Sequence, residues 1–357
     1  MNYKSVMALL IVIALALWVS GSATLAGHKA NAAPQTTGCT RTAKPGVNTL
    51  PEAASAGSVV CLHGGIYRAS DSVFRFRTSN VTVKSYPGEQ ARLHGSIRTI
   101  NSISNFVLGD KGAEWPAGDG LRIDASYGLR ERLTPNKCPR CTDSVATQGI
   151  HWDSDFGGIY ANSISNRAAN GDTTRAGTGI LISGGENPRG VQIDGNFIHR
   201  TGQVPRNNHE HAVYAAGMIG GSITDNLIYD AADRGIQMYS HPRGVLVAGN
   251  LVAYGRHAGL HSNSTATNIF FRNNVSVFNS TWNYYAGPTS TGSGNRLNAN
   301  CFWSPSGSAR LRLDSSVTAS NNVTAKPRLN SGLADGVVKV TNPRCAAKLP
   351  AGSRFRP

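Results

Sequence analysis

The hydrophobic and polar positions of the chain repeat from about residue 150 onward, with the same order in each copy. Short apolar segments alternate with polar turns, and an asparagine stands at the same point of every copy. The asparagines recur at spacings of 24, 24, 26 and 22 residues, at Asn226, Asn250, Asn274, Asn300 and Asn322. A fixed period of this length is the signature of a solenoid, in which each copy forms one coil.

Each copy divides into three short apolar segments. Two successive copies predict strands over residues 235–238, 245–247 and 251–253, and over 259–262, 268–271 and 275–277. Three strands and three turns in about 24 residues predict one coil of a parallel β-helix. Stacked coils place each asparagine above the last at the sheet spacing of ~4.8 Å, where side-chain amides can bond one another. The asparagines are therefore predicted to be architectural.

The first 32 residues have the pattern of a secretory signal peptide. Lys4 precedes an apolar run over residues 6–19, and Ala30-Asn31-Ala32 supplies a small-x-small cleavage site. The run is shorter than the ~20 apolar residues that a membrane span needs. We expect a secreted, extracellular product without stable membrane insertion, and retention of the segment as an anchor is the alternative.

One domain over residues 33–357 accounts for the rest of the chain. Residues 49–54 predict a short capping helix, because the open end of a solenoid would expose apolar core and unpaired strand edges. The period breaks over residues 110–147, which predict a long lateral loop, and decays over residues 329–357, which predict a capping tail. A monomer is expected.

The six cysteines form an even set behind the signal peptide, which favours disulfides over metal thiolates. The expected bridges are Cys39–Cys61, Cys138–Cys141 and Cys301–Cys345. Cys138-Pro-Arg-Cys141 has the spacing of a redox motif, but it lies in a polar loop without a βαβ pattern. A structural bridge is therefore favoured over a redox role.

The chain is strongly basic, with 35 Lys and Arg against 20 Asp and Glu. Removing Lys4 and Lys29 with the leader lowers the net charge from +15 to +13. A basic secreted protein attracts polyanions, and arginine binds carboxylates in a bidentate way. No heptad run, basic amphipathic helix or aromatic nucleic-acid signature is present, so nucleic acid is disfavoured and an acidic polysaccharide is expected. The alternative is that the arginines only solvate the outer faces of the solenoid.

Two pairs of segments resemble known proteins. Residues 61–67 (CLHGGIY) and 81–89 (VTVKSYPGE) are similar to the start of secreted bacterial right-handed parallel β-helix proteins of the pectate-lyase-like superfamily. Residues 209–214 and 233–239 resemble a segment pair in actinobacterial members. The resemblance implies an all-β right-handed parallel β-helix with an acidic glycan along one face, beside the strand after the third turn. The activity stays open, because β-helices carry lyases, hydrolases, epimerases, esterases and adhesins.

Strand alternation locates that face in the sequence. Ile236 and Met238 must point into the coil, so Gln237 and Tyr239 point outward. The same parity predicts an outward file of His151, Leu181, Tyr214, Gln237, His261 and Tyr285. A flanking file two positions further on contains Asp153, Ser183, Ala216, Tyr239 and Asn263. The turn that leads into these strands adds His209, Glu210, His211, Asp233, Arg234, Arg256 and His257.

Histidine is concentrated on this face, which carries five of the ten histidines. Cleaving an acidic glycan by β-elimination needs a cation for the uronate carboxylate, a base for the C5 proton and an acid for the leaving oxygen. We assign the carboxylate to Arg234 with His211 or Gln237, the base to Tyr214 or His261, and the acid to Tyr239 or His241. The residues expected to bind substrate around them are His209, Gln237, His241, Asn263, His257, Tyr285 and His151.

Three alternatives remain open at this point. A hydrolase would need two carboxylates, for which Asp153, Asp155 and Asp233 are candidates. A zinc or calcium site is conceivable at His209, Glu210, His211 and Asp233, and otherwise no cofactor is expected. A non-catalytic glycan-binding or cell-wall-binding β-helix is the main rival, favoured by Tyr284 and Tyr285 and by the basic charge.

Overall fold

The computed structural model describes residues 38–51, 54–100, 103–126, 148–167, 177–183, 187–206, 208, 210–288, 290–330 and 332–357. The signal segment, Cys138, Cys141, most of the predicted lateral loop and His209 lie outside these residues. All of the described residues belong to one compact unit.

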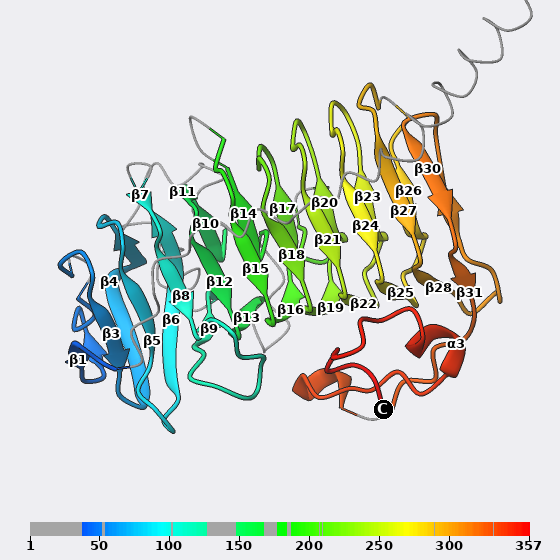
Figure 1. Cartoon of the computed structure of the whole chain (residues 1–357). Helices are drawn as coiled ribbons and strands as arrows, with labels where there is room; N and C mark the ends of the chain where they lie inside the picture. The colour runs from blue at the N-terminus through cyan, green and yellow to red at the C-terminus, as the bar shows by residue number, and fades with distance from the viewer. Residues whose placement is uncertain are drawn as a thin grey trace, which may run out of the picture. The chain divides into compact units, whose positions relative to one another are not determined.

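Short parallel strands wind around an apolar core and stack coil upon coil, which confirms the predicted parallel β-helix (Figure 1). Each coil contributes strands to three sheets. The first sheet precedes the asparagine turn, the second follows this turn, and the third completes the coil before the chain returns to the first.

The strands of the first sheet are β1 (Arg41–Ala43), β3 (Val59–Leu62), β5 (Thr82–Ser85), β8 (Val107–Gly109), β12 (Gly158–Tyr160), β15 (Gln192–Asp194), β18 (Ser222–Thr224), β21 (Leu246–Ala248), β24 (Phe270–Arg272), β27 (Asn295–Asn298) and β30 (Val317–Ser320). Those of the second are β2 (Gly46–Val47), β9 (Arg122–Asp124), β13 (Ser163–Asn166), β16 (Phe197–Thr201), β19 (Leu227–Ala231), β22 (Leu251–Ala253), β25 (Val275–Val277), β28 (Cys301–Trp303) and β31 (Val323–Thr324).

The third sheet contains β10 (Ile150–Trp152), β14 (Ile180–Ile182), β17 (Val213–Ala215), β20 (Arg234–Met238), β23 (Ala258–Ser262), β26 (Trp282–Ala286) and β29 (Leu311–Arg312). The second and third sheets are continuous near the N-terminal end, where β4 (Gly65–Phe76) and β6 (Ala91–Thr99) contribute to both. A minor pair is formed by β7 (Ile103–Ser104) and β11 (Ser154–Asp155).

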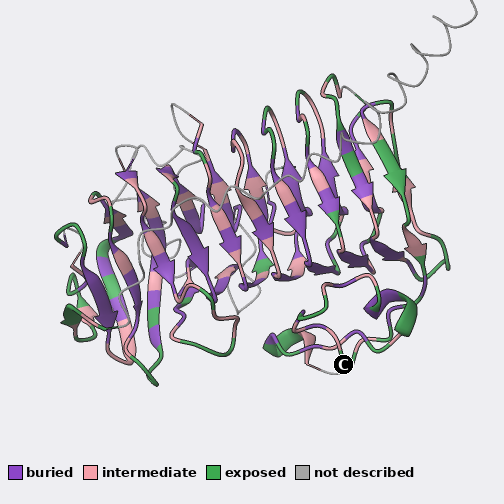
Figure 2. Ribbon diagram, in the orientation of Figure 1, coloured by how far each residue is buried: buried purple, intermediate pink, exposed green. Residues whose placement is uncertain are grey.

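Alternation along the strands decides which side chains fill the core. Ile236, Leu260 and Tyr284 are aligned on successive strands of the third sheet, and each is 0% exposed. Figure 2 shows that buried positions dominate the strands in the middle of the stack, whereas strands at its ends, such as β30, are largely exposed. The residues next to these core positions in sequence therefore project from the outer side of the sheet.

The asparagine ladder is confirmed, and it is longer than the regular period indicates. Asn250 Oδ1 accepts hydrogen bonds from the backbone N and from Nδ2 of Asn226, both at 3.0 Å. Asn250 Nδ2 donates to Asn274 Oδ1 at 3.0 Å and to the Ile223 carbonyl at 2.8 Å. Similar bonds extend the ladder back through Asn196 to Asn162, over steps of 30 and 34 residues.

The chain after β31 folds back along the outer side of the second sheet. The second sheet carries apolar residues on its outer side as well as on its inner side. Outward residues such as Leu251 and Val275 therefore have to be shielded from water by another part of the chain. Val340, Leu349 and Phe355 of the C-terminal segment pack on them, together with the 3₁₀ turn η2 (Leu333–Asp335) and the helix α3 (Pro343–Ala346) (Figure 1). The segment thus protects the flank of the second sheet.

Two of the three expected disulfides lie among the described residues and are confirmed. Cys39 bonds Cys61 of β3, and Cys301 of β28 bonds Cys345 of α3. The first bridge fastens the beginning of the solenoid, and the second fastens the C-terminal segment to the second sheet. The expected Cys138–Cys141 bridge lies outside the described residues.

The beginning of the solenoid differs from the expected helical cap. Residues 49–51 and 54, the described part of the predicted capping helix, are not helical. Instead, β1 and β2 form an incomplete first coil, pairing with β3 and β4. Leu50 and Ala54 are 6% and 2% exposed, so the apolar residues that suggested a helix cover the core from an irregular segment.

Within the described parts of the chain, no helix has the length and apolar character needed to cross a membrane.

Candidate active site

The outer side of the third sheet carries the predicted file on consecutive strands. The backbone register aligns His151 with Leu181, Leu181 with Tyr214, and Tyr214 with Gln237. Gln237 is then aligned with His261, and His261 with Tyr285. Strand parity was sufficient to place these residues because Ile150, Ile236 and Leu260, their neighbours, occupy the core.

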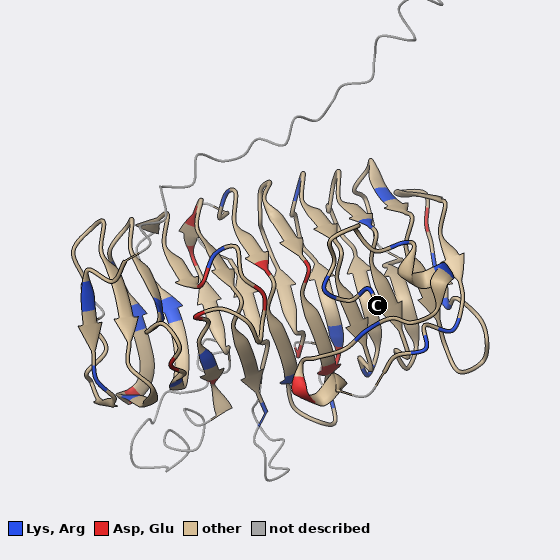
Figure 3. Ribbon diagram, turned by 60° about the horizontal axis from the view of Figure 1, so that its bottom comes forward, with Lys and Arg blue, Asp and Glu red and all other residues tan. Residues whose placement is uncertain are grey.

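Three arginines that the sequence analysis missed extend this file at both ends. Arg98 of β6 is aligned with His151, and Arg75 of β4 is aligned with Arg98. At the other end Arg312 is aligned with Tyr285. The coils around Arg75 and Arg98 do not follow the asparagine period. The alternation of apolar and charged residues in Phe74-Arg75-Phe76 nevertheless indicates a strand with Arg75 on its outer side. Elsewhere, Lys and Arg are scattered over the coils (Figure 3).

Asp233, which sequence reasoning considered only for hydrolysis or metal binding, is the centre of the site. Its side chain is 0% exposed and lies in the turn before β20. Arg206 Nη1 donates to Oδ1 at 2.9 Å, and Arg234 Nη1 donates to Oδ2 at 2.5 Å. The Nδ1 atoms of His211 and His257 lie 3.3 Å from Oδ2 and Oδ1. One carboxylate therefore joins two guanidinium groups and two imidazoles from three coils.

This surrounding charge keeps Asp233 ionised. Burial by itself would raise the pKa of Asp233, but the close imidazoles of His211 and His257 and the guanidinium of Arg234 hold it far below its usual value. An ionised carboxylate on Nδ1 fixes the orientation of an imidazole and leaves Nε2 as its reactive nitrogen. Asp233 thus acts as a positioning residue for both histidines.

Gln237 and His261 stand next to this centre with polar atoms that lack partners. They are 6% and 2% exposed. Gln237 Oε1 and both ring nitrogens of His261 are buried without a hydrogen bond to any described residue. Burial, and then the charge of Arg234, lowers the pKa of His261 well below its usual value, so its imidazole is neutral. Buried polar atoms of this kind need a partner, which a water molecule, an ion or a polar group of a ligand can supply.

Two tyrosines close one side of the cluster. The rings of Tyr214 and His211 meet edge to face with centroids 5.2 Å apart, and Tyr239 lies nearly parallel to Tyr214 at 6.4 Å. Burial, together with the nearby Tyr239, raises the pKa of Tyr214 to about 12. Tyr214 therefore keeps its proton at neutral pH, which suits a proton donor and not a base.

An aromatic platform borders the other side. The Tyr285 ring lies 5.0 Å from His261 and 5.8 Å from His257, measured between ring centroids. Trp282 lies nearly parallel to it at 6.1 Å, and the guanidinium of Arg312 is 5.3 Å from its centroid. Tyr284, proposed from the sequence as a second glycan contact, is instead 0% exposed and packs in the core.

Other predicted residues lie outside the cluster. His151 is two strands from Tyr214, and its Nε2 is 3.0 Å from Ser183 Oγ. His241 lies in an exposed turn, where its ring nitrogens contact Ser240 and Asn187. Asn263 directly follows β23 in the flanking file, Arg256 contacts Asp230 at 3.3 Å, and Glu210 is 2% exposed. His209 lies outside the described residues.

Of the carboxylates named for hydrolysis, Asp153 and Asp233 are too far apart to act together. Asp155 Oδ1 accepts a hydrogen bond from the Arg189 backbone N at 2.7 Å. Asp153 and Asp233 belong to coils three strands apart in the third sheet, a separation of ~14 Å at the usual sheet spacing. That exceeds the spacing of two glycosidase carboxylates.

The structure also does not form the alternative metal site from the residues it describes. Among them, no group of three or more His, Cys, Asp and Glu side chains is arranged to hold a metal ion. Of the four proposed ligands, His209 lies outside the described residues. The carboxylate oxygens of Asp233 already contact two arginines and two histidines.

No protein-family model matches the chain, and no curated protein sequence matches it. Among solved structures, the chain is similar to the Dettilon tailspike protein at 11% identity, with a TM-score of 0.47 and coverage of 80% of this chain. The match spans only 61% of the tailspike chain. Pectate lyase Pel9A is 13% identical, with a TM-score of 0.49 and 89% of each chain covered. The periplasmic alginate epimerase AlgG is 15% identical, with a TM-score of 0.37, 78% of this chain covered and 79% of that one. At these identities and TM-scores, the chemistry of the chain has to be argued from its own residues.

Proposed function

We propose that the chain is a secreted polysaccharide lyase, which binds an acidic polysaccharide along the outer side of the third sheet and cleaves it by β-elimination. The observation that carries this proposal is the pair Gln237 and His261. Their buried polar atoms lack partners among the described residues and lie beside two arginines and two histidines held on Asp233. A structural sheet face would not require such a cluster, whereas an anionic substrate with transferable protons would use all of it.

Arg234 and Gln237 are assigned to the uronate carboxylate. Arg234 is 7% exposed, and its Nε is buried without a partner among the described residues. A guanidinium and an amide that contact the carboxylate withdraw charge from it, which makes the neighbouring C5 proton more acidic. Asp233 and Asn208 hold Arg234 in place through Nη1, so it is positioned before substrate arrives.

His261 is assigned as the base and Tyr214 as the acid. A neutral imidazole has a lone pair for the C5 proton, and a bound carboxylate raises its pKa by adding a negative charge close to it. When His261 takes the proton, the electron pair of the C5–H bond forms the C4–C5 double bond and the C4–O bond breaks. The leaving oxygen takes the proton of Tyr214, which is protonated at neutral pH. Tyr239 lies behind Tyr214 and replaces His241 as the nearest second donor.

A glycan-binding protein without catalysis is the second candidate, because Tyr285 with Trp282 and Arg312 forms a platform suited to a sugar ring. Aromatic faces and cations bind acidic sugars without any proton transfer. On that reading, the histidines would serve only as hydrogen-bonding groups. The two candidates share one surface and differ in the product.

A substrate screen separates these candidates. The mature protein is incubated with pectate, alginate, hyaluronan, heparan and glucuronan, and the ultraviolet absorbance of an unsaturated uronide is followed. We expect absorbance to rise with at least one glycan, and His261→Gln to lower the rate by about 100-fold, as for loss of a general base. His94→Gln is the matched control, because the backbone register aligns His94 with Arg68 and Asp124 in the second sheet, away from the cluster on the third sheet. Binding of a glycan without any rise in absorbance would favour the non-catalytic candidate.

A further inference from the structure

Two arginines and a histidine occupy consecutive positions at the N-terminal end of the outward file. Phe74, Ile97 and Ile150 point into the core, so Arg75, Arg98 and His151 project outward from β4, β6 and β10. The three side chains line one small cavity of about 80 Å³. The remaining lining residues are Val73, Ser96, Ile97 and Gln148.

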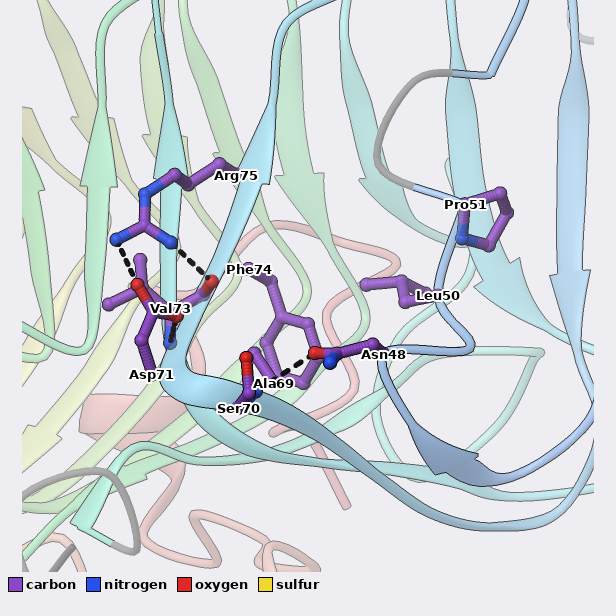
Figure 4. Close-up of a pocket in the computed structure, with 9 residues that line it drawn as sticks. All are labelled: Asn48, Leu50, Pro51, Ala69, Ser70, Asp71, Val73, Phe74 and Arg75. Carbon is purple, nitrogen blue, oxygen red and sulfur yellow. Dashed lines mark hydrogen bonds and ion pairs between the residues drawn. The ribbon is translucent and has the colours of Figure 1, made fainter.

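The cavity has a positive charge that is only partly compensated. No Asp or Glu is among its lining residues. Arg75 Nη2 lies 2.5 Å from Oδ2 of the half-exposed Asp71, and Arg75 Nη1 donates to the Val73 carbonyl at 3.1 Å (Figure 4). Arg98 forms no ion pair with a carboxylate of the described chain, and its charge contributes to lowering the pKa of His151, after burial.

The cavity also has room beside it. A larger hollow of about 570 Å³ shares Val73 and Arg75 with it and is lined further by Asn48, Leu50, Pro51, Ala69, Ser70, Asp71 and Phe74 (Figure 4). Arg75 thus borders both hollows, whereas Arg98 lines only the smaller one.

The position of the cavity relates it to the candidate active site. Arg98 is three strands from Tyr214, through His151 and Leu181, which is a distance of ~14 Å at the usual sheet spacing. An extended chain of 1,4-linked pyranose units advances by about one sheet spacing per sugar. A glycan that lies along the file and reacts near Tyr214 would thus bring a unit three or four sugars away to Arg98. Leu181, half-buried between them, offers an apolar surface to an intervening sugar ring.

We propose that Arg75, Arg98 and His151 form a distal subsite for an acidic substituent, a carboxylate or a sulfate ester, of the same glycan chain. The proposal rests on the proposed function, since it assumes that an acidic glycan lies along the third sheet. Guanidinium groups bind both substituents through charge-assisted hydrogen bonds, and His151 adds a ring nitrogen, Nδ1, that has no partner among the described residues. The consequence is a preference for long chains, because only they reach both the distal subsite and the reacting centre.

The test compares Arg98→Ala with Arg92→Ala. Both arginines belong to β6, but Arg92 is exposed and aligned with Arg122 in the second sheet, so the control removes the same charge from the other face. Dissociation constants are measured by calorimetry for trimers and octamers of galacturonate and of alginate, and for a heparin-derived octasaccharide. Arg98→Ala should weaken octamer binding by about tenfold and reduce the preference for octamer over trimer, as expected for losing a hydrogen-bonded charge.

The outcomes separate this inference from the proposed function. If octamers bind Arg98→Ala as tightly as they bind Arg92→Ala, the distal subsite is refuted, even when the parent protein cleaves the glycan. If Arg98→Ala weakens octamer binding and no glycan is cleaved, the distal subsite is supported and the protein binds the glycan without cleaving it. The octasaccharide that shows the larger loss identifies the substituent as carboxylate or sulfate. Failure of every octamer to bind the parent protein would overturn both proposals.

Discussion

Replacing Asn250 by leucine tests the asparagine ladder on which the coil stack depends. Leucine has nearly the shape of asparagine but no hydrogen-bonding groups, so the change removes bonds with little change in volume. Asn226 N loses its only ladder acceptor and becomes an unpaired buried donor. The Asn226 amide, Asn274 Oδ1 and the carbonyls of Ile223 and Ala248 each lose one partner as well.

The size of the effect follows from these five groups. An unpaired buried group costs about 1–3 kcal/mol, and each of the four partly satisfied groups about 0.5–1.5 kcal/mol, which together give roughly 3–9 kcal/mol. For a solenoid of this size that corresponds to a fall in melting temperature of about 4–13 °C. Differential scanning calorimetry measures the shift directly.

Asn298→Leu is the control for this change. Asn298 is half-buried on the first sheet, and among the described residues its Nδ2 donates only to Ser320 Oγ, at 2.7 Å. Its loss should lower the melting temperature by no more than about 1 °C, because a solvated hydrogen bond contributes little. If Asn250→Leu melts like Asn298→Leu, the ladder does not stabilise the stack and the reasoning fails.

Three further changes address the tail, the site and the pH dependence. Cys345→Ser should lower stability by about 2–4 kcal/mol and increase proteolysis of the C-terminal segment, since the bridge to β28 closes a 44-residue separation; cleavage no faster than in the parent would contradict this. Tyr214→Phe should reduce glycan turnover by about 100-fold with an almost unchanged melting curve. Tyr229→Phe, on the second sheet, should leave both the turnover and the melting curve unchanged. Full activity in Tyr214→Phe would exclude Tyr214 as the acid. Burial, with nearby carboxylates, raises the pKa of Asp225 to about 7, so the folded state holds its proton more tightly than the unfolded state. The contribution of Asp225 should therefore be present near pH 4 and lost as the pH rises to about 7. Asp225→Asn should accordingly match the parent near pH 4 and be more stable than it above pH 7, as followed by thermal melts; the same difference at both pH values would refute the assignment.

The coils with a regular period could be predicted from sequence in detail. The strands around residues 236, 247 and 252 are found within one or two residues of their expected positions, because short loops leave the hydrophobic pattern undisturbed. The ladder steps at Asn162 and Asn196 escaped this reasoning, since insertions of several residues hide the period although the backbone register continues. The predicted helix at residues 49–54 failed for a different reason, as tertiary packing of Leu50 and Ala54 on the core outweighs a short helical pattern.

The site could be predicted as a surface, but its centre could not. Strand parity places Tyr214, Gln237 and His261 on neighbouring strands, because parity is a local property. The central position of Asp233 depends on turns from three coils converging on one carboxylate, and no spacing rule predicts how such turns fold.

The central claim is that the outer side of the third sheet cleaves an acidic polysaccharide by β-elimination. The most direct measurement is mass spectrometry of the products formed by the mature protein in water enriched in oxygen-18, with the glycan that the screen identifies. The account predicts fragments with an unsaturated uronate at the new non-reducing end and no solvent oxygen incorporated during bond cleavage, formed about 100-fold more slowly by His261→Gln. Saturated fragments that carry solvent oxygen would show hydrolysis, and an equal rate for His261→Gln would show that this face is not the active site.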